Sequence, residues 1–172
     1  MAALVTTSSS GRPGAASLRP RGGTVATGGT TLDALEGYEL FAHEADIGVR
    51  GWGPTREKAF EQVALALTSA ITDPQLVESR EPVGICCEAP DDEVLLVDWL
   101  NALVYQMATL AMLFGRFEVR IHDHRLEATA WGEPLDPLKH RPAVEIKGAT
   151  FTEVAVRRLE DGRWLAQCVV DV

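Results

Sequence analysis

The chain has 172 residues, 46% of them hydrophobic and 24% charged, which is enough for one domain with its own core and requires no second domain. Its formal net charge is −9. The first 31 residues hold three arginines and no acid, so the remainder carries 13 basic and 25 acidic side chains, a net charge of −12, which excludes tight binding of phosphate backbones by this protein alone.

Residues 1–34 are rich in Ala, Gly, Ser, Thr and Pro and contain no aromatic residue, so they cannot bury enough apolar surface to offset the entropy of ordering. We therefore predict a disordered tail over residues 1–34 and a folded domain over residues 35–172. The apolar start Met1–Val5 is too short for a secretory signal. A transit peptide fits the composition, but the tail lacks amphipathic periodicity, which favours a plain extension or a misassigned start codon and a cytoplasmic protein.

Two strand-like pieces open the predicted domain. Tyr38–Ala42 alternates in the manner of a strand, and Ile47–Trp52 resumes the extended pattern. The polar interruption His43-Glu44-Ala45-Asp46 lies between them. Polar side chains are therefore expected at the joint of two strands.

The first helix is predicted to begin after Thr55, a good N-cap residue that follows the strand-stopping Gly53-Pro54. Apolar residues then recur at helical spacing as far as Ile71, and Asp73-Pro74 ends the helix. Pro82–Glu88 reads as a short strand.

The second helix is predicted to begin at the acids of Pro90–Glu93, which the helix dipole favours at an N-terminus. The apolar stretch Val94–Phe114 approaches the length of a membrane span, but it contains Asp98, which costs roughly 2.5–3.5 kcal/mol in mid-membrane. We predict no membrane span. A helix that is apolar nearly all round belongs in the centre of the fold, covered on more than one side.

The C-terminal half changes to period two and is predicted to be mostly sheet. The predicted strands are Arg116–Ile121, Arg125–Trp131, Ala143–Phe151, Glu153–Leu159 and Arg163–Val170. Asp161-Gly162 indicates a hairpin turn, whereas the three prolines within residues 133–142 indicate a loop. The whole pattern predicts a single α+β domain with two helices packed on one mostly antiparallel sheet.

The interruption between the first two strands gathers His43, Glu44 and Asp46. Polar residues at such a place are usually solvated turn residues. In a straight strand, residues 43 and 46 would point to opposite faces because their separation is odd. Only a bend or bulge would let both serve one site.

The C-terminus offers oxygen donors, because the apolar strand Leu165–Val170 runs directly into Asp171-Val172. The Asp171 side chain and the α-carboxylate of Val172 are then close together. Ca²⁺ and Mg²⁺ prefer oxygen ligands of this kind, although an ordinary strand end with a solvated acid fits the same pattern. Lys147 lies in a predicted strand with Val144 and Ile146 on the opposite face, where a lysine usually faces solvent.

Other catalytic patterns are missing from the sequence. Cys86, Cys87 and Cys168 are an odd number without Cys-x-x-Cys spacing, so they predict neither a disulfide framework nor a zinc knuckle. There is no Gly-x-Ser-x-Gly and no glycine-rich phosphate loop. These absences argue modestly against an enzyme.

Several of these stretches, in order along the chain, resemble the archease family. Tyr38–Gly53 is similar to its opening motif, in which a strand leads into His-Thr-Ala-Asp-Ile-Gly. Leu95–Tyr105 looks like its central helix, Glu127–Pro137 its following strand and loop, and Val144–Thr150 its lysine strand. The final Asp171-Val172 is like the family's terminal Asp-Val or Asp-Ile.

The resemblance implies a non-enzymatic accessory protein that promotes guanylylation and multiple turnover of an RtcB-type RNA ligase in tRNA splicing or RNA repair. It implies a calcium site at Asp46, Asp171 and the C-terminal Val172, with Mg²⁺ or Mn²⁺ as other oxygen-preferring cations. It also implies that Lys147 is needed for ligase activation. His43 and Glu44 are expected beside the metal.

Two residues depart from the family pattern. Glu44 replaces the usual Thr of the opening motif, and Thr152 stands where the family commonly has His after an aromatic residue, here Phe151. An extra carboxylate at Glu44 would strengthen cation binding if it points inward. This chain therefore lacks the family histidine at position 152.

Two other functions fit parts of the pattern. A metal-dependent hydrolase would use His43 as base and a metal at Asp46 and Asp171 to supply the attacking water, but Ca²⁺ activates water poorly and the sequence has no zinc ligand set. A small-molecule-binding module would instead show an apolar pocket with few convergent polar groups.

Overall fold

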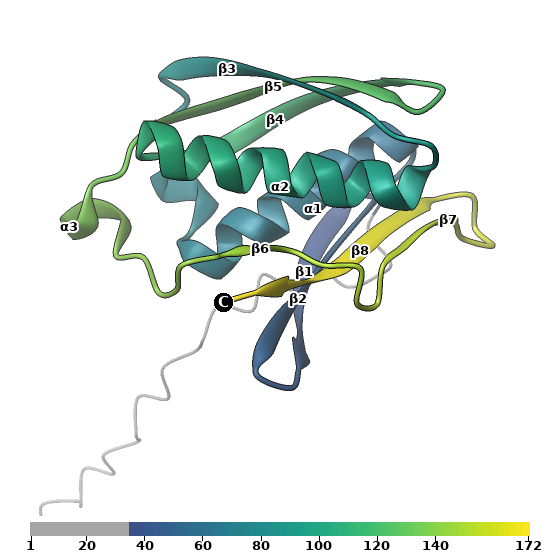
Figure 1. Cartoon of the computed structure of the whole chain (residues 1–172), viewed down its shortest axis with the longest axis horizontal. Coiled ribbons are helices and arrows are strands. Elements are labelled where there is room, and N and C mark those ends of the chain that lie inside the picture. The colour runs from purple at the N-terminus through teal and green to yellow at the C-terminus, as the bar shows by residue number, and fades with distance from the viewer. Residues whose placement is uncertain (1–34) are drawn as a thin grey trace, which may run out of the picture.

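The computed structural model describes residues 35–172, so the tail predicted at residues 1–34 lies outside the described residues. In the described range, two long helices lie between two antiparallel sheets (Figure 1). The predicted α+β class is confirmed. The strands form two sheets where we expected one, and a third, short helix is present.

The first sheet has five strands in the order β1-β2-β8-β6, with β7 also paired to β8, and every pair is antiparallel. Its members are β1 (Gly37–His43), β2 (Asp46–Gly53), β6 (Gly148–Ala149), β7 (Ala155–Arg158) and β8 (Trp164–Asp171). β1 and β2 are the two strands predicted on either side of the polar interruption. Their hairpin projects from the body of the molecule (Figure 1).

The first helix, α1 (Arg56–Ile71), begins where the sequence predicts, because the Thr55 hydroxyl accepts a 3.1 Å hydrogen bond from the Lys58 N–H. A short 3₁₀ turn, η1 (Pro74–Leu76), follows it. α1 contacts β2 of the first sheet on one side and β4 (Met112–His122), a strand of a second sheet, on the other, so its apolar residues are buried on two sides.

β2 approaches α1 closely at Gly51. A Cβ atom there would lie 2.2 Å from the backbone nitrogen of Val63 and 2.7 Å from the carbonyl oxygen of Ala59. Those are helix backbone atoms, so the helix itself would have to move. The absence of a side chain at Gly51 therefore sets the spacing between the sheet and α1.

We expect Gly51→Ala to lower the free energy of unfolding by about 1–3 kcal/mol, the usual cost of overpacking a core. Gly84→Ala on β3 (Glu81–Glu88) is the matched control, because a Cβ at Gly84 meets no atom within 4 Å. Chemical denaturation of both variants measures the difference. Equal stability would show that α1 does not lie this close to β2 in solution.

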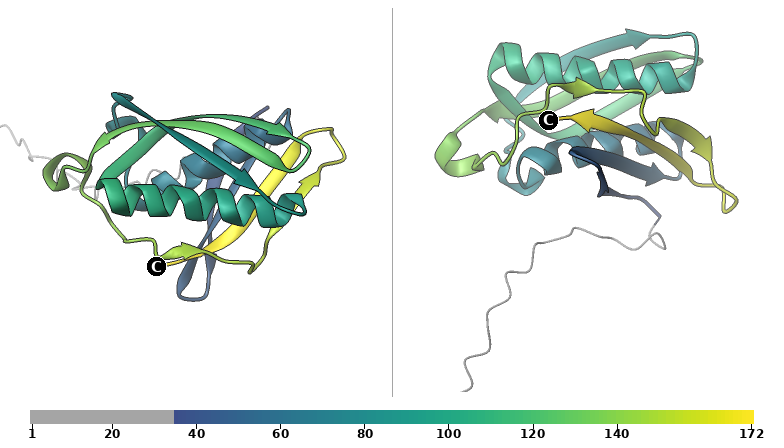
Figure 2. Two further views of the ribbon diagram at one scale, coloured as in Figure 1. Left: turned by 45° about the horizontal axis from the view of Figure 1, so that its top comes forward. Right: turned by 60° about the horizontal axis from the view of Figure 1, so that its bottom comes forward.

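The second sheet has the order β3-β5-β4 and covers the other side of the helices (Figures 1 and 2). Its members are β3 (Glu81–Glu88), β4 (Met112–His122) and β5 (Arg125–Pro134). Strands predicted at 82–88, 116–121 and 125–131 are thus confirmed. The β4–β5 hairpin turns at Asp123, which has a φ of 53°.

The second helix, α2 (Asp92–Leu110), begins at Asp91, whose carboxylate accepts a 2.8 Å hydrogen bond from the Val94 N–H. Most apolar residues of its N-terminal half are buried, with Trp99 and Leu100 at 0% exposure. Our expectation of cover on more than one side is wrong for the C-terminal half, where Tyr105 is 64% exposed. Asp98 is also exposed and requires no buried partner.

The apolar stretch Val94–Phe114 is divided between two elements, because Ala111 adopts a left-handed conformation that ends α2 and β4 begins at Met112. No helix within residues 35–172 is long and apolar enough to cross a membrane.

The prediction of a strand over Ala143–Phe151 is wrong except at β6 (Gly148–Ala149). Val144, Glu145 and Ile146 form no hydrogen bond with the rest of the described chain. Ile146 is 7% exposed whereas Glu145 is exposed, so the period-two pattern reflects one side of an extended segment lying on the core. Pairing with a neighbouring strand is a separate condition, and only Gly148–Ala149 meets it.

Other boundaries differ slightly. A short helix, α3 (Pro137–His140), forms inside the predicted loop because the Asp136 carboxylate accepts a 2.9 Å hydrogen bond from the Leu138 N–H. β7 is shorter than the strand predicted at 153–159. The predicted β7–β8 hairpin is confirmed, with Gly162 at a φ of 89°.

Candidate functional site

The β1–β2 hairpin brings two of the predicted site residues together. His43 and Asp46 are cross-strand partners at its tip, separated by the two turn residues Glu44 and Ala45. Cross-strand partners lie on the same face of a sheet, so a tight hairpin achieves what a straight strand would not. The sequence analysis required a bend for residues 43 and 46 to serve one site. That bend is this turn, in which Glu44 has a φ of 52°.

Asp171 joins the same row. β2 and β8 pair with Ile47 opposite Val170, and the next pair outward in this register is Asp46 and Asp171. On the other side of β8, Gly148 of β6 is the partner of Asp171. By this register, His43, Asp46 and Asp171 lie side by side across the first sheet.

We call His43, Asp46 and Asp171 the carboxylate row. Their side chains lie on the face of the sheet that points away from the helices. A Cβ at Gly51 would point into α1, and side chains alternate along β2, so Asp46 is on the opposite face from Gly51. On β8, Val170 is 0% exposed and faces the core, whereas Asp171 is exposed. The row is open to solvent and to a binding partner.

Lys147 lies beside this row although it is not in a regular strand. Its N–H donates to the Asp171 carbonyl at 2.8 Å, and its ammonium Nζ donates to the main-chain oxygen of Val172 at 3.3 Å. The Val172 side chain packs against the core. The structure thus brings Lys147, Asp171 and Val172 to the same place by way of β6 and β8.

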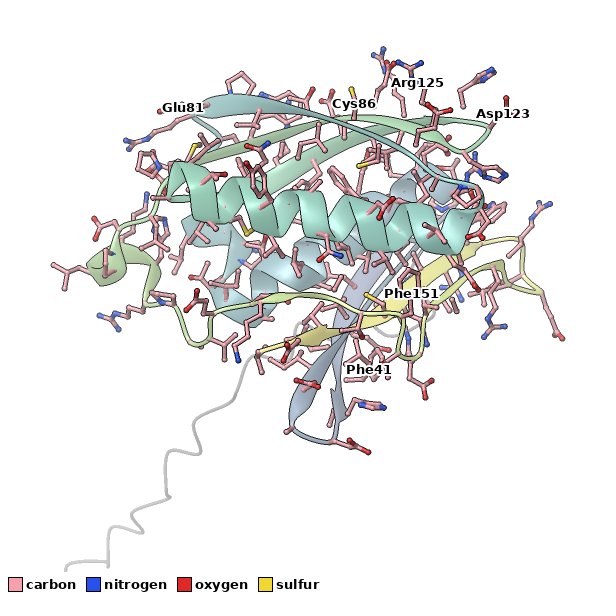
Figure 3. The ribbon with its side chains drawn as sticks, in the orientation of Figure 1. Phe41, Glu81, Cys86, Asp123, Arg125 and Phe151 are labelled. Carbon is pink, nitrogen blue, oxygen red and sulfur yellow. The ribbon has the colours of Figure 1, made fainter. Side chains whose placement is uncertain are left out.

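The hairpin that carries His43 and Asp46 is braced along the same face. The Phe41 ring covers Gly48, where an added Cβ would lie 2.2 Å from a ring carbon, and the Arg50 guanidinium lies 4.6 Å from the ring centre (Figure 3). Arg50 donates to Glu39 at 2.5 Å and to Gln167 at 2.8 Å. These contacts join β1, β2 and β8 next to the carboxylate row.

The two departures from the family pattern are both exposed. Glu44 lies in the turn, outside the row formed by the paired strand residues. Thr152 accepts a backbone hydrogen bond from the Val169 N–H at 3.0 Å, next to the exposed Phe151.

The donor chemistry of the row suits a hard cation. Asp46, Asp171 and a terminal carboxylate offer only oxygen atoms, which Ca²⁺, Mg²⁺ and Mn²⁺ prefer. Within residues 35–172, no three His, Cys, Asp or Glu side chains are arranged to hold a metal by themselves.

The three cysteines are free thiols, and two of them are poor metal ligands because the thiolate is disfavoured. Burial raises the pKa of Cys168 to about 12 and that of Cys87 to about 11. Neither is suited to act as a nucleophile at neutral pH.

A buried polar cluster that the sequence analysis missed lies at the end of β5. Glu133 is 3% exposed and accepts hydrogen bonds from Lys139 at 2.6 Å, from the Glu78 N–H at 3.1 Å and from His140 Nε2 at 2.9 Å. The Asp136 N–H donates to His140 Nδ1, which leaves the proton of a neutral ring on Nε2. The hydrogen bond from Lys139 is the main cause that lowers the pKa of Glu133 to about 2.

An apolar cavity of about 320 Å³ opens between α2 and the segment that leads to Lys147. The sequence alone did not locate it. Its walls are Ile71, Val104, Met107, Ala108, Met112, Leu113, Leu135, Pro142, Val144, Glu145 and Ile146. This is the kind of pocket that a small-molecule-binding module would show.

Comparisons with known proteins agree on one family. The model of the Archease protein family (MTH1598/TM1083) matches residues 38–172. The chain is 41% identical over 139 residues to Protein archease of Pyrococcus furiosus, covering 78% of this chain and 98% of that protein, and 42% identical over 139 residues to Protein archease of Thermococcus gammatolerans, with the same coverage. A solution structure of protein 1598 of Methanobacterium thermoautotrophicum superposes with a TM-score of 0.67 at 32% identity, over 79% of this chain and 99% of that one.

Proposed function

Because the chain belongs to the archease family, we propose that it activates an RtcB-type RNA ligase in tRNA splicing or RNA repair, as a cytoplasmic metal-binding accessory protein with no catalysis of its own. The protein would promote guanylylation of the ligase and let it turn over repeatedly. The observation that carries this proposal is the convergence of Asp46, Asp171, Val172 and Lys147 at one end of the five-stranded sheet.

Asp46, Asp171 and the Val172 α-carboxylate would hold the cation, with Ca²⁺ the first candidate. A bound cation would neutralise this concentration of negative charge. His43, the cross-strand partner of Asp46, would help to position that carboxylate. The support is the register that places His43, Asp46 and Asp171 in one row and the oxygen-only chemistry of the donors.

Lys147 would be the group that acts on the ligase. Its ammonium is exposed and donates a hydrogen bond to the Val172 oxygen. A cation that binds this oxygen would displace the ammonium, which would then be free to contact a partner. The acidic body, with its net charge of −12 over residues 32–172, would dock against a basic face of the ligase instead of binding RNA itself.

The proposal is tested with the purified protein and its ligase at substoichiometric ratio. We expect ligase guanylylation and the number of turnovers to rise with added protein. The protein alone should show no ligase or nuclease activity and no RNA binding below about micromolar concentration at physiological salt. Unchanged turnover across the titration would refute the proposal.

The same assay separates the role of Lys147 from a structural role. Lys147→Ala should abolish activation while circular dichroism stays near the parent spectrum, because the side chain is exposed. Calcium affinity should not fall, because the ammonium that competes with the cation for the Val172 oxygen is removed. Lys139→Ala is not a suitable control, since Lys139 holds the buried Glu133. Arg120→Ala is better matched, because Arg120 is an exposed basic residue on β4 of the other sheet.

Two alternatives make different predictions in these assays. A metal-dependent hydrolase using His43, Asp46 and Asp171 would cleave substrate without the ligase. The apolar cavity favours a small-molecule-binding module as the second candidate function. That module would bind its ligand equally well whether or not the ligase responds to the protein.

A further inference from the structure

The apolar cavity is roofed by a segment with an unusual attachment. We call residues 135–147 the strap, because they cross from the end of β5 to Lys147 over the C-terminal half of α2 and the end of α1. The strap supplies five of the cavity walls: Leu135, Pro142, Val144, Glu145 and Ile146. Apart from the short α3, it contains no regular secondary structure.

The strap is hydrogen-bonded to the body of the protein as far as Ala143 and again at Lys147. At the first end the Leu135 N–H donates to the Ala111 carbonyl at 2.8 Å, and the buried Glu133 cluster holds α3. The Ala143 N–H donates to the Ile71 carbonyl, and the next fastening is the Lys147 N–H on Asp171, each at 2.8 Å. Between them residues 144–146 form no hydrogen bond with the rest of the described chain, and Val144 and Ile146 pack on the core. This part can therefore adjust to an occupant without breaking a hydrogen bond.

The lining defines what the cavity accepts. Its volume of about 320 Å³ is within the range of small-molecule pockets, which begins at about 300 Å³. Ten of its eleven lining residues are apolar, and Met107 and Met112 have flexible side chains that adapt to irregular shapes. Glu145 is the one ionisable residue in the lining, so a negatively charged ligand is disfavoured.

We propose that this cavity is a binding site for an uncharged, mainly apolar small molecule the size of a fused aromatic ring system, and that its occupancy is transmitted to Lys147 through the strap. The proposed binding of a small molecule depends only on the properties of the cavity. The consequence for ligase activation rests on the function proposed above.

The transmission follows from the order of residues along the strap. Val144 and Ile146 touch the occupant, and Lys147 is the next residue. Its two hydrogen bonds, from N–H to Asp171 and from Nζ to Val172, connect the strap directly to the carboxylate row. A ligand that displaces residues 144–146 must change the geometry of at least one of these two hydrogen bonds.

Binding is tested with two probes that share a ring system. N-phenyl-1-naphthylamine is neutral, and 8-anilino-1-naphthalenesulfonate carries an added negative charge. We expect saturable fluorescence enhancement with the neutral probe and weaker binding of the sulfonate by roughly threefold or more, a gap that narrows in Glu145→Gln. Failure of the neutral probe to saturate, or equal affinity of both probes, would overturn the assignment.

Two neighbouring residues of α2 supply matched variants. Ala108 lines the cavity and Thr109 does not, although both are exposed and neither change touches the core. Ala108→Trp should fill the mouth and weaken the neutral probe by about tenfold or more, whereas Thr109→Trp should bind it as the parent does. Equal loss in both variants, or none in either, would place the probe elsewhere.

Transmission is tested by nuclear magnetic resonance on the same samples. Saturating neutral probe should shift the backbone amide resonance of Lys147 in the parent protein and not in Ala108→Trp, with the remote Asp123 amide unchanged in both. A saturated cavity with an unmoved Lys147 amide would refute the transmission. Because the ligase is absent from this experiment, its result does not depend on whether the ligase is activated by this protein.

Discussion

A tag added after Val172 is expected to weaken calcium binding by this protein at least about tenfold, because it converts the terminal α-carboxylate to a neutral amide and crowds the carboxylate row. Ligase activation should fall with it. The same tag placed before Met1 should leave both unchanged. Calcium titration calorimetry and the ligase turnover assay on the two tagged proteins make the comparison.

Asp171→Asn and Asp46→Asn should reproduce the loss, since each removes one negative charge with little change in side-chain volume. The matched control is Asp123→Asn, which changes an exposed aspartate on the β4–β5 turn in the other sheet (Figure 3). Circular dichroism should show all three variants folded. If the C-terminal tag and the Asp171→Asn variant both keep parent calcium affinity, the assignment of the metal site is wrong.

Glu133→Ala is expected to lower the free energy of unfolding by about 3 kcal/mol, as removing one partner of a buried ionic group commonly does. The substitution leaves the fully buried His140 ring and the Glu78 N–H without their acceptor. Glu127→Ala is the control, because Glu127 is an exposed acid whose ion pair with Arg125 spans 3.6 Å, and it should cost less than about 0.5 kcal/mol. Denaturant unfolding of the two variants and the parent measures both values.

The effect of Glu133 should depend on pH in a definite direction. Its pKa is about 2 in the folded protein against an ordinary value of 4.5, so its contribution is fully present above pH 4.5 and is lost as the pH falls toward 2. The stability gap between the parent and Glu133→Gln should therefore shrink over that interval. A gap that is constant from neutral pH down to pH 2 would mean that the carboxylate is not the stabilising form.

The buried cluster and the cavity together bear on regulation. Glu133, Lys139 and His140 hold one end of the strap, and Lys147 lies at the other. A variant that loosens the cluster is expected to affect the strap as well as global stability. Probe binding in Glu133→Gln, measured under conditions where that variant is fully folded, reports this coupling directly.

The sequence by itself determined the elements whose signals are local. Thr55 predicted the start of the first long helix, the acids of Pro90–Glu93 that of the second, and Asp161-Gly162 a hairpin, because caps and turns are made by residues close together in the chain. The ordered motifs also predicted the family, which the comparisons confirm.

The tertiary structure alone decided which distant residues meet. The sequence named His43, Asp46, Asp171 and Lys147, but their arrangement in one place depends on the β1–β2 turn and on the pairing of β8 with β2 and β6. Strand register is set by packing of whole elements, since a shift of one residue would move every side chain to the other face. The same reason explains the wrong strand prediction over Ala143–Phe151 and the omission of the buried Glu133 cluster, because burial and pairing both depend on neighbours far away in the chain.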